Sequence, residues 1–410
     1  MLATAQIVSL DRDECRARAI ATAPEIRVAE GDVEAGGLNL GIANAGFLPT
    51  LNGEGAYLRS STDRHGIPDF AANNGEDEYL ARGVLSQPLY AGGALSAARR
   101  KAQAEQGAAS HALAATRSQV LLAADEAFYS VQTGAERVTI AEAAQATSVE
   151  LLRAARVRFD NGEIPALDVG RLELEVAQAT TAVDSARTQL SIARDELATL
   201  VGVSASAVDV RPSQDDDVPR AESLDDVIAS ASASRPEVKK LELDVQALEG
   251  AVGLARGARL PQLRAEAAAG WDSLALPDGR NGGWQAGVAL SVPLWDWKVL
   301  ERREHLAQVE VDKARQRLAA VRRAITLEVT RRYLEVDLAS RLLATAIQAE
   351  RLARRNADSA RQGYALGLVS NLELITAERQ ATAAASDRSA TRLAQRLATS
   401  RLDFAAGRLE

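Results

Sequence analysis

Three histidines and one cysteine are the side chains of this 410-residue chain that are most typical of transition-metal ligands or nucleophiles. His65, His111 and His305 are far apart and lack the spacing of a metal site. Cys15 is the single cysteine, so it forms no internal disulfide, and a lone cysteine is more often a small buried hydrophobe than a reactive group. The sequence contains no phosphate-binding or nucleophile motif. We therefore expect no catalytic residues, no metal and no cofactor.

Residues 211–226, "RPSQDDDVPRAESLDD", contain three adjacent aspartates at 215–217. Carboxylate oxygens bind hard cations, which makes this run a candidate cation site. A run of like charges is, however, more typical of a solvated segment. We expect an exposed linker here.

Two acids lie close to predicted helix starts. Ser370 to Glu373 reads "SNLE", a capping box in which the serine caps the helix and the glutamate reaches back to the cap. Asp168 follows Pro165 by three residues, in a first turn where the helix dipole favours acids. The local pattern therefore offers a structural explanation for both acids, Glu373 in a capping box and Asp168 through the helix dipole.

The sequence contains an internal duplication. "PEI" at Pro24 recurs as "PEV" at Pro236, shifted by 212, and "SQPLY" at 86–90 recurs as "SVPLW" at 291–295, shifted by 205. The shift of 205 is constant from Pro88 to Gly202, so 115 residues align without a gap. Each half is predicted to contain a helix, two strands, a long helix, a short tip and a second helix.

The long helices are predicted from proline-free stretches. Residues 92–160 contain no proline, and 298–362 contain neither proline nor glycine. Apolar residues in the second stretch follow the 3-4 spacing of a helix face. About 65 residues give a rod of roughly 100 Å, which is typical of a coiled-coil bundle. A second helix, at 167–201 or 371–406, is expected to return antiparallel to each rod.

The strands are predicted from alternation. Residues 263–271 and 284–294 alternate between one apolar face and one small or polar face. About 10 alternating residues suffice for a transmembrane β-strand. Aromatic residues, which favour the membrane–water interface, cluster at the strand ends. Those flanking the two hairpin loops are Tyr57, Tyr79, Trp271 and Trp284, and those at the other edge are Tyr90, Trp295 and Trp297.

A soluble β-sandwich with core tryptophans is the alternative interpretation of these strands. We favour the membrane, because a soluble core does not need aromatics at strand ends. Four strands cannot close a barrel, and an open sheet edge is forbidden in lipid. The barrel must then be shared between chains, with eight strands in a dimer or twelve in a trimer.

Composition sets further limits. The net charge of -8 argues against a nucleic-acid partner. No apolar run is long enough for a transmembrane helix. The first residues, "MLATAQIVSLDRDE", lack a basic n-region and a long apolar core, so we expect that a signal peptide is absent from this chain.

The duplicated "LPxL" strand entry, "QPLYAGG" before a long helix and "GYALGLVSNLEL" at a helical tip resemble the TolC family of outer membrane efflux proteins. The resemblance extends from about Ser9 to Gly407. It implies a mainly α fold with membrane β: long antiparallel helical hairpins form a periplasmic α-barrel, and each chain contributes four strands to a shared 12-stranded transmembrane β-barrel. The implied homotrimer is a passive exit duct, not an enzyme, in the bacterial outer membrane with a long periplasmic extension.

The resemblance also implies partners. A periplasmic adaptor (membrane fusion) protein links the duct to an inner-membrane transporter in an efflux pump or a type I secretion system, and outer-membrane lipid surrounds the barrel. The transported substrate, whether a drug, a metal ion or a polypeptide, leaves no local mark on such a duct. The alternative function is a periplasmic coiled-coil adaptor or scaffold, which would carry one helical hairpin and small β-domains instead of two hairpins and two strand pairs.

The resemblance further implies a periplasmic gate at the helical tips. Tyr364 matches the gating tyrosine and Glu373 the first acidic ring, whereas Thr376 replaces the second acid and Val369 the gating arginine. Asp168 is the first-half equivalent of Glu373, and Phe159 that of Tyr364. A weaker or differently built latch is expected. The adaptor is expected to dock at the same tips, at Gly162, Gly367, Leu368 and Ser370.

These expectations divide the chain into six segments that follow the repeat. The predicted segments are an N-terminal helical or equatorial segment (1–46), transmembrane β-hairpin 1 (47–90), periplasmic helical hairpin 1 (91–205), a linker and equatorial helix (206–258), transmembrane β-hairpin 2 (259–294) and periplasmic helical hairpin 2 (295–410). Residues 1–45, the linker and the C-terminus are expected to form a belt around the middle of the tunnel.

Overall fold

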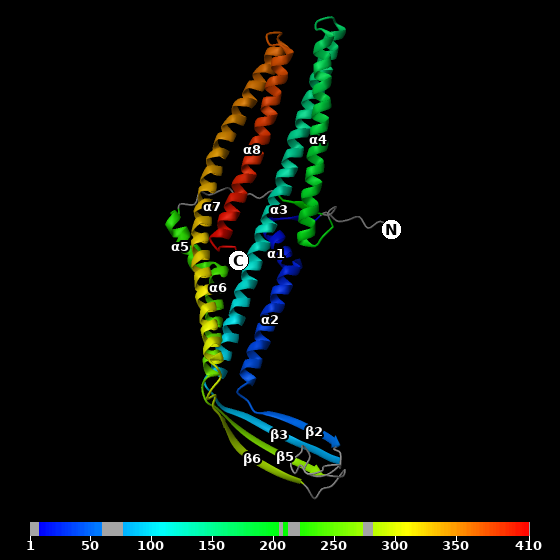
Figure 1. The fold of residues 1–410 in the computed structure, drawn as a ribbon. Helices are drawn as coiled ribbons and strands as arrows, with labels where there is room; N and C mark the ends of the chain where they lie inside the picture. Colours follow the sequence, from blue (N-terminus) through cyan, green and yellow to red (C-terminus); the bar gives the residue numbers. More distant parts are fainter. Residues whose placement is uncertain (1–7, 60–76, 205–207, 212–221, 274–281, 410) are drawn as a thin grey trace. The chain divides into compact units, whose positions relative to one another are not determined.

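The computed structural model describes residues 8–59, 77–204, 208–211, 222–273 and 282–409 (Figure 1). Most of the aspartate-rich linker, 212–221, and His65 lie outside the described residues. The elements, in chain order, are β1 (Val8–Leu10), α1 (Arg12–Thr22), α2 (Pro24–Ala45), β2 (Thr50–Arg59), β3 (Asp77–Ala91), α3 (Ala94–Asp160), α4 (Ala166–Val201), β4 (Val208–Val210), α5 (Leu224–Ser234), α6 (Pro236–Gly257), β5 (Gln262–Ser273), β6 (Gly282–Ser291), α7 (Val299–Ala365) and α8 (Asn371–Ala405).

The duplication predicted from the sequence is confirmed in the helix boundaries. Helix α7 begins and ends 205 residues after α3 (94 to 299, 160 to 365). Helices α5 and α6 begin and end 212 residues after α1 and α2 (12 to 224, 24 to 236). The two halves therefore repeat the same order of elements, and the helix pairs α1 and α5, α2 and α6, and α3 and α7 have equal lengths.

The chain divides into two compact units. The helical unit consists of Met1–Ala29, Leu113–Val238 and Val321–Glu410, and the sheet unit of Glu30–Ala112 and Lys239–Ala320. Helices α3 and α7 contribute residues to both units. None of the helices in the described ranges is both long enough and apolar enough to cross a membrane.

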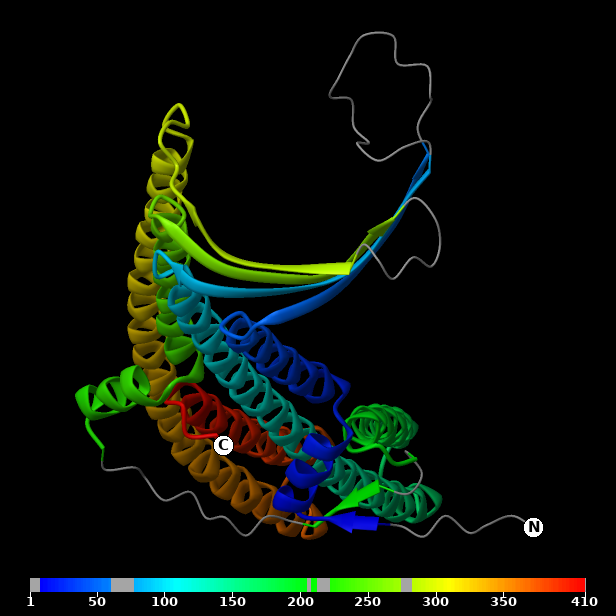
Figure 2. The ribbon, with the colours of Figure 1, turned by 90° about the horizontal axis from the view of Figure 1, so that it is seen from below.

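The sheet unit contains one antiparallel sheet with the strand order β2-β3-β5-β6, drawn as a curved surface in Figure 2. The two hairpins have equivalent registers: Tyr57 pairs with Tyr79, and the residues that follow them by 212 and 205, Ala269 and Trp284, also pair. The central pair, β3 with β5, joins the two halves of the chain. Both edge strands, β2 and β6, are exposed along their whole length.

The predicted alternation places the aromatic side chains on one face of the sheet. Directly paired residues project to the same side, so Tyr57 and Tyr79 share a face, as do Trp271 and its partner Ala81. A β-bulge between Pro88 and Tyr90 brings Tyr90 opposite Leu263, on this same face. The charged pair Glu54 and Arg82 lies on the other face, with a 2.7 Å ion pair.

The strand predicted over residues 284–294 ends earlier in the structure than its alternating pattern. The pattern continues to Leu294, but β6 ends at Ser291. Pro293 follows, and proline has no N–H group to donate to a strand ladder, which gives a physical reason for the early end.

Helices pack closely beside the sheet within the same unit. A Cβ on Gly250, Gly253 or Gly257 of α6 would lie less than 3 Å from an atom of α3, so these glycines allow the two helix backbones to approach. Val245 and Val252 of α6 form a small buried cluster with Val311 and Ala314 of α7.

The helical unit has its own core. Phe128 and Val131 of α3 are fully buried with Leu197 of α4, and Leu10 and Cys15 pack in the same cluster. The prediction that Cys15 is a buried hydrophobe is confirmed, and burial is the main cause that raises the pKa of its thiol to about 12. Asp125 is also fully buried, where it accepts hydrogen bonds from Arg16 (2.7 and 2.6 Å) and Ser400 (3.0 Å).

Candidate functional site

The tips of both helical hairpins are built by the same turn. Gly162 follows α3 with φ of 76°, and Gly367 follows α7 with φ of 74°. At each tip two backbone bonds close the helix: Gly162 donates to Phe159 and Glu163 to Arg158, both at 2.8 Å, and the residues 205 positions later repeat the pattern. This is a Schellman motif, whose left-handed position favours glycine. Both glycines therefore have a structural role in the turn at the helical tips.

The capping box predicted at the start of α8 is confirmed. The Ser370 hydroxyl accepts a hydrogen bond from the Glu373 N–H at 3.2 Å, and the Glu373 carboxylate accepts from both the N–H and the hydroxyl of Ser370 at 2.8 Å. These bonds, the backbone one first, lower the pKa of Glu373. In the single chain this exposed carboxylate therefore caps its own helix.

Asp168 occupies the first turn of α4, but its side chain caps nothing. The N-cap residue, Pro165, makes no side-chain cap bond. The Asp168 carboxylate faces Arg171 at 3.4 Å, and its backbone oxygen accepts a hydrogen bond from the Asn371 side chain at 3.0 Å. Because Asn371 is the first residue of α8, this bond links the start of one hairpin's second helix to the start of the other's.

Tyr364 lies against the other hairpin. The guanidinium carbon of Arg158, from α3, is 4.9 Å from the centroid of the Tyr364 ring, and Arg158 donates a long hydrogen bond of 3.5 Å to the Tyr364 backbone oxygen. The Tyr364 hydroxyl is buried and has no hydrogen-bond partner among the described residues. Val369, at the position matched to the gating arginine, instead packs where a Cβ on Gly363 would be, 2.4 Å from the Val369 Cγ2.

A third link lies about two turns further along α8 than Asn371. Arg379 donates to Glu175 at 2.7 Å and to Gln178 at 2.6 Å, both on α4. Hydrogen bonding to Glu175 raises the pKa of Arg379. A small buried cluster of Ala155, Leu172 and Ile375 supports the same region. The two hairpin tips of one chain are thus joined through α3–α7, α4–α8 and a shared apolar cluster.

The residues that make these links, Arg158, Asn371 and Arg379, were not predicted. A single sequence does not show which faces of four alanine-rich helices are neighbours. One signal was present for Arg158, since its repeat equivalent is Gly363 (158 to 363), so the two tips differ there.

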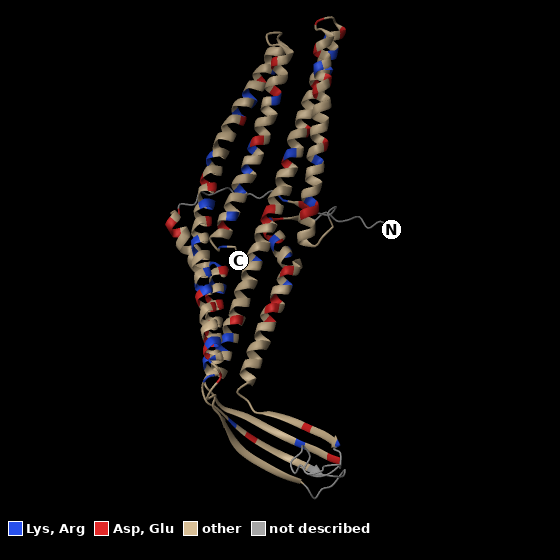
Figure 3. Cartoon of the chain, viewed as in Figure 1, with Lys and Arg blue, Asp and Glu red and all other residues tan. Residues whose placement is uncertain are grey.

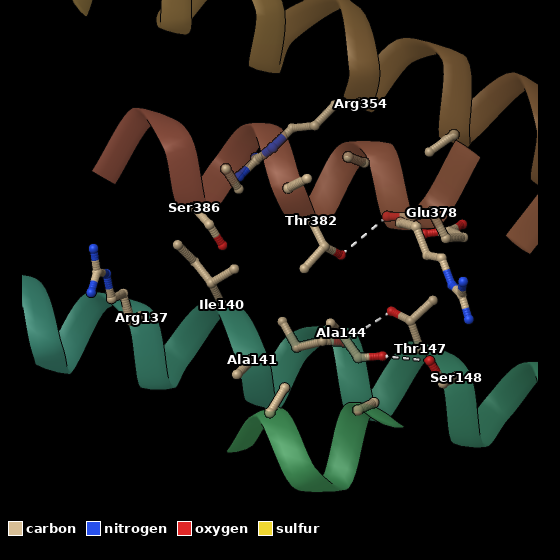
Figure 4. Close-up of a pocket in the computed structure, with 18 of the residues that line it drawn as sticks. Arg137, Ile140, Ala141, Ala144, Thr147, Ser148, Arg354, Glu378, Thr382 and Ser386 are labelled. Carbon is tan, nitrogen blue, oxygen red and sulfur yellow. Dashed lines mark hydrogen bonds between the residues drawn. The ribbon is translucent and has the colours of Figure 1, made fainter. Parts of the chain in front are cut away.

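Behind the tips, the same four helices enclose a cavity of about 1060 Å³ (Figure 4). Its walls are largely alanine, threonine and serine side chains, with Ala144, Thr147 and Ser148 of α3 facing Thr382 and Ser386 of α8. Small side chains leave space between the hairpins here, and Arg379, Glu175 and Gln178 of the third link line the same cavity.

The surface of the tips is apolar and exposed. Leu368 is 79% exposed, and a Cβ on Gly162 or Gly367 would meet no atom within 4 Å. Other large apolar side chains exposed at the tips are Phe159, Leu167, Leu366 and Leu372. Such a patch on a helical tip is typical of a protein contact.

The predicted interface aromatics lie in the sheet unit and are mostly exposed. Tyr57 and Tyr79 have ring centroids 4.9 Å apart, and Trp295 and Trp297 meet edge to face at 5.6 Å. Trp284 is 81% exposed. In the part of the chain that the structure describes, no group of His, Cys, Asp or Glu is arranged to hold a metal ion, and the aspartates at 215–217 lie outside that part.

Comparison with protein families gives one match, to the outer membrane efflux protein family, over residues 16–203 and 227–408. Comparison with curated proteins gives no match. Among solved structures, CusC is similar with a TM-score of 0.86 and 17% identity, covering 98% of this chain and 93% of its own. A Pseudomonas aeruginosa membrane protein has a TM-score of 0.86 and 20% identity, over 98% and 91%. The Campylobacter jejuni CmeC outer membrane channel has a TM-score of 0.84 and 17% identity, over 97% and 86%.

Proposed function

Since this chain belongs to the outer membrane efflux protein family, we propose that three copies form a passive exit duct through the bacterial outer membrane. Four strands from each copy would close a twelve-stranded transmembrane barrel, and the helical hairpins would form a tunnel in the periplasm. An inner-membrane transporter would supply the energy, and a periplasmic adaptor would connect the two, in an efflux pump or a type I secretion system.

The observation that carries this proposal is the uncovered sheet. Its edge strands have no partner within the described chain, and its aromatic face leaves large side chains such as Val288 and Leu290 exposed. The exposed apolar face of the sheet favours contact with lipid, but strand edges without hydrogen-bond partners are not tolerated in the bilayer core. Pairing β6 of one copy with β2 of the next satisfies both conditions. Twelve strands leave a lumen, whereas eight are just filled by side chains.

The duplication predicts the register of this joint between copies. By the repeat, β6 is equivalent to β3 and β2 to β5, so the β6–β2 joint should copy the β3–β5 pairing within the chain. Leu85 pairs with Ala267. Their equivalents, shifted by 205 and 212, are Leu290 and Gly55, which should therefore face each other across the joint.

A disulfide experiment tests the trimer and this register together. Oxidation of the Leu290→Cys, Gly55→Cys double variant should give covalent trimers in denaturing gels. The matched control, Ala286→Cys with Gly55→Cys, is out of register by four residues and should give few. Cys15 is fully buried, so it should not interfere. Monomers alone from both variants, with the strands intact by circular dichroism, would rule out the shared barrel.

We also assign the gate and the adaptor contact to the tips. The links between the hairpins would hold the tips together, and the cavity behind them gives one hairpin room to move against the other. Tyr364, Glu373 and Asp168 would line the constriction. The exposed surface with Gly162, Gly367, Leu368 and Ser370 would bind the adaptor. Planar-bilayer recording tests the gate, because breaking a link should raise the conductance of the isolated duct.

A further inference from the structure

The backbone between β6 and α7 contains an unusual turn. Trp297 has φ of 55° and Lys298 has φ of 64°, and among the described residues no other non-glycine residue has positive φ. The left-handed region brings a Cβ close to the backbone, and bulky side chains rarely adopt it. Two consecutive residues of this kind mark a strained site.

The first half of the chain makes the same turn with glycine. Gly92 and Gly93 are the repeat equivalents of Trp297 and Lys298 (92 to 297, 93 to 298), with φ of 59° and 81°. Glycine adopts these angles without strain. A Cβ on Gly92 would lie 2.4 Å from the Gly257 oxygen, so glycine is also required there by space. The second half therefore keeps the turn and carries a large side chain at a position where glycine would relieve the strain.

Asp296 stabilises the strained turn. Its carboxylate accepts hydrogen bonds from the N–H groups of Lys298 at 3.0 Å and Leu300 at 2.7 Å, at the start of α7 where the helix dipole favours an acid. The repeat equivalent of Asp296 is Ala91, which has no such group. The second half thus has Asp-Trp-Lys at 296–298 where the first half has Ala-Gly-Gly at 91–93, and all three positions differ together.

The turn gains no packing inside the protein. Trp295 and Trp297 contact each other edge to face, yet each is 77% exposed, and the neighbouring Leu294 is 90% exposed. An exposed indole pair on a strained backbone stabilises the protein only if something outside the chain covers it.

Several basic residues lie close to this pair in the sequence and in the same sheet unit. Lys298, Arg302 and Arg303 are exposed and form no ion pair with any residue in the described ranges. Arg256 and Arg259 share one acid, Glu304, at 3.0 and 2.7 Å. Figure 3 shows the resulting blue cluster where α6 ends and α7 begins. The cluster is notable in a chain with a net charge of -8.

We propose that Trp295, Trp297 and the basic side chains of Lys298, Arg302 and Arg303 form one binding surface for anionic phospholipid. This inference rests on the proposed membrane location. The indoles would occupy the boundary between acyl chains and headgroups, and the cations would meet lipid phosphates. Lys298 directly precedes α7, and the helix rises by about 6 Å from Val299 to Arg303, which is comparable to the thickness of one headgroup layer.

Tryptophan quenching by brominated lipid tests the proposal. A variant that keeps only Trp297, with phenylalanine at 271, 284 and 295, is reconstituted into vesicles of phosphatidylcholine with a minor fraction of brominated phosphatidylglycerol or brominated phosphatidylcholine. Brominated phosphatidylglycerol should quench at least about twofold more strongly, because cations enrich anionic lipid. Equal quenching by the two lipids would overturn the proposal. Conductance of the same samples separates this failure from failure of the duct itself.

Charge variants identify the residues responsible. In the same background, replacing Lys298, Arg302 and Arg303 with glutamine should abolish the preference for phosphatidylglycerol. The matched control removes three charges further along α7, at Lys313, Arg315 and Arg317, and should retain it. If both triple variants behaved alike, the preference would reflect overall charge and the assigned surface would be wrong.

The strained turn at Trp297 gives a separate prediction, about the unfolding temperature in detergent and in anionic lipid. Trp297→Gly should raise the unfolding temperature in uncharged detergent by a few degrees, because glycine relieves the left-handed turn. In phosphatidylglycerol vesicles the same variant should lose this advantage. A lower unfolding temperature in detergent would show that Trp297 stabilises the protein itself, which would contradict a role in lipid binding.

Discussion

Arg158, in the last turn of α3, lies over the ring of Tyr364 at the end of α7, with 4.9 Å between the guanidinium carbon and the ring centroid. The contact joins two helices whose residues are 206 positions apart. It occurs where the resemblance placed a gating tyrosine and where Val369 replaces the gating arginine. The cation that would complete such a latch is supplied by the first half of the chain.

Replacing this arginine should open the proposed gate. A cation–π contact contributes about 0.5–2 kcal/mol, so Arg158→Gln should increase the open population several-fold. Planar-bilayer recording of the isolated protein measures this as a higher open probability. Arg153→Gln is the control, because Arg153 lies in the same helix and pairs only with Glu150 in that helix. An unchanged open probability in Arg158→Gln would exclude Arg158 from the latch.

Glu373 should control block by divalent cations. If three copies line the constriction, their carboxylates attract cations, and Mg²⁺ added on the periplasmic side should reduce the conductance. Glu373→Gln should relieve this block. Because Thr376 stands at the second acidic position, the block should be weaker than that of a gate with two acidic rings. A block that persists in Glu373→Gln would leave this residue as a helix cap only.

The same residue gives a prediction for pH. The Ser370 bonds lower the pKa of Glu373, so the cap contributes fully above the ordinary carboxyl pKa of about 4.3 and is lost as the pH falls through the lowered value. The hydrogen-exchange protection factors of the amides at the start of α8, which correct for the intrinsic pH dependence of exchange, should therefore fall below about pH 4. Glu373→Gln should remove this dependence, whereas Ser370→Ala should only weaken it, because alanine keeps the backbone N–H that contributes most. A pKa above the ordinary range in the assembled protein would instead reveal repulsion between copies.

Gly270 should be indispensable to the sheet. A Cβ there would lie 2.2 Å from the Ala81 oxygen and 2.5 Å from the Arg82 Cα, both backbone atoms of β3. Gly270→Ala should therefore disrupt the β3–β5 pairing and abolish assembly. Gly287→Ala is the control, because its Cβ would meet no atom within 4 Å. The yield of detergent-stable oligomer compares the two, and equal yields would contradict the close approach.

The buried carboxylate of Asp125 should contribute strongly to the stability of the helical unit. Asp125→Ala would leave Arg16 without its two hydrogen bonds, and breaking a buried charge pair costs about 3–5 kcal/mol. Thermal unfolding followed by circular dichroism should show a large decrease. Glu126→Ala, which breaks the partly exposed pair with Arg401, should have little effect.

The elements that could be predicted from the sequence are those whose residues follow a regular pattern, either the internal repeat or the alternation of a strand. The shift of 205 located both long helices, since α7 begins one residue after the predicted Lys298, and alternation located the strands. The SNLE capping box was also local, because its partners are three residues apart. The contacts of Arg158, Asn371 and Arg379 depend on which helix faces meet, which no local pattern specifies. The turn at Trp297 was missed because a tryptophan is a poor sequence signal for positive φ.

The β3–β5 pairing joins the two halves of one chain in the way that the proposed β6–β2 pairing would join neighbouring chains. Six half-chains would then stand around one axis, each making the same contact with the next. Six copies of a single half-length chain could therefore close the ring through one kind of strand pairing. The covalent link between the two halves of the present chain adds no further kind of contact. Tandem fusion of such a hexamer's subunits would yield the proposed trimer, and it would free one half to change, as at the positions where Asp-Trp-Lys replaces Ala-Gly-Gly.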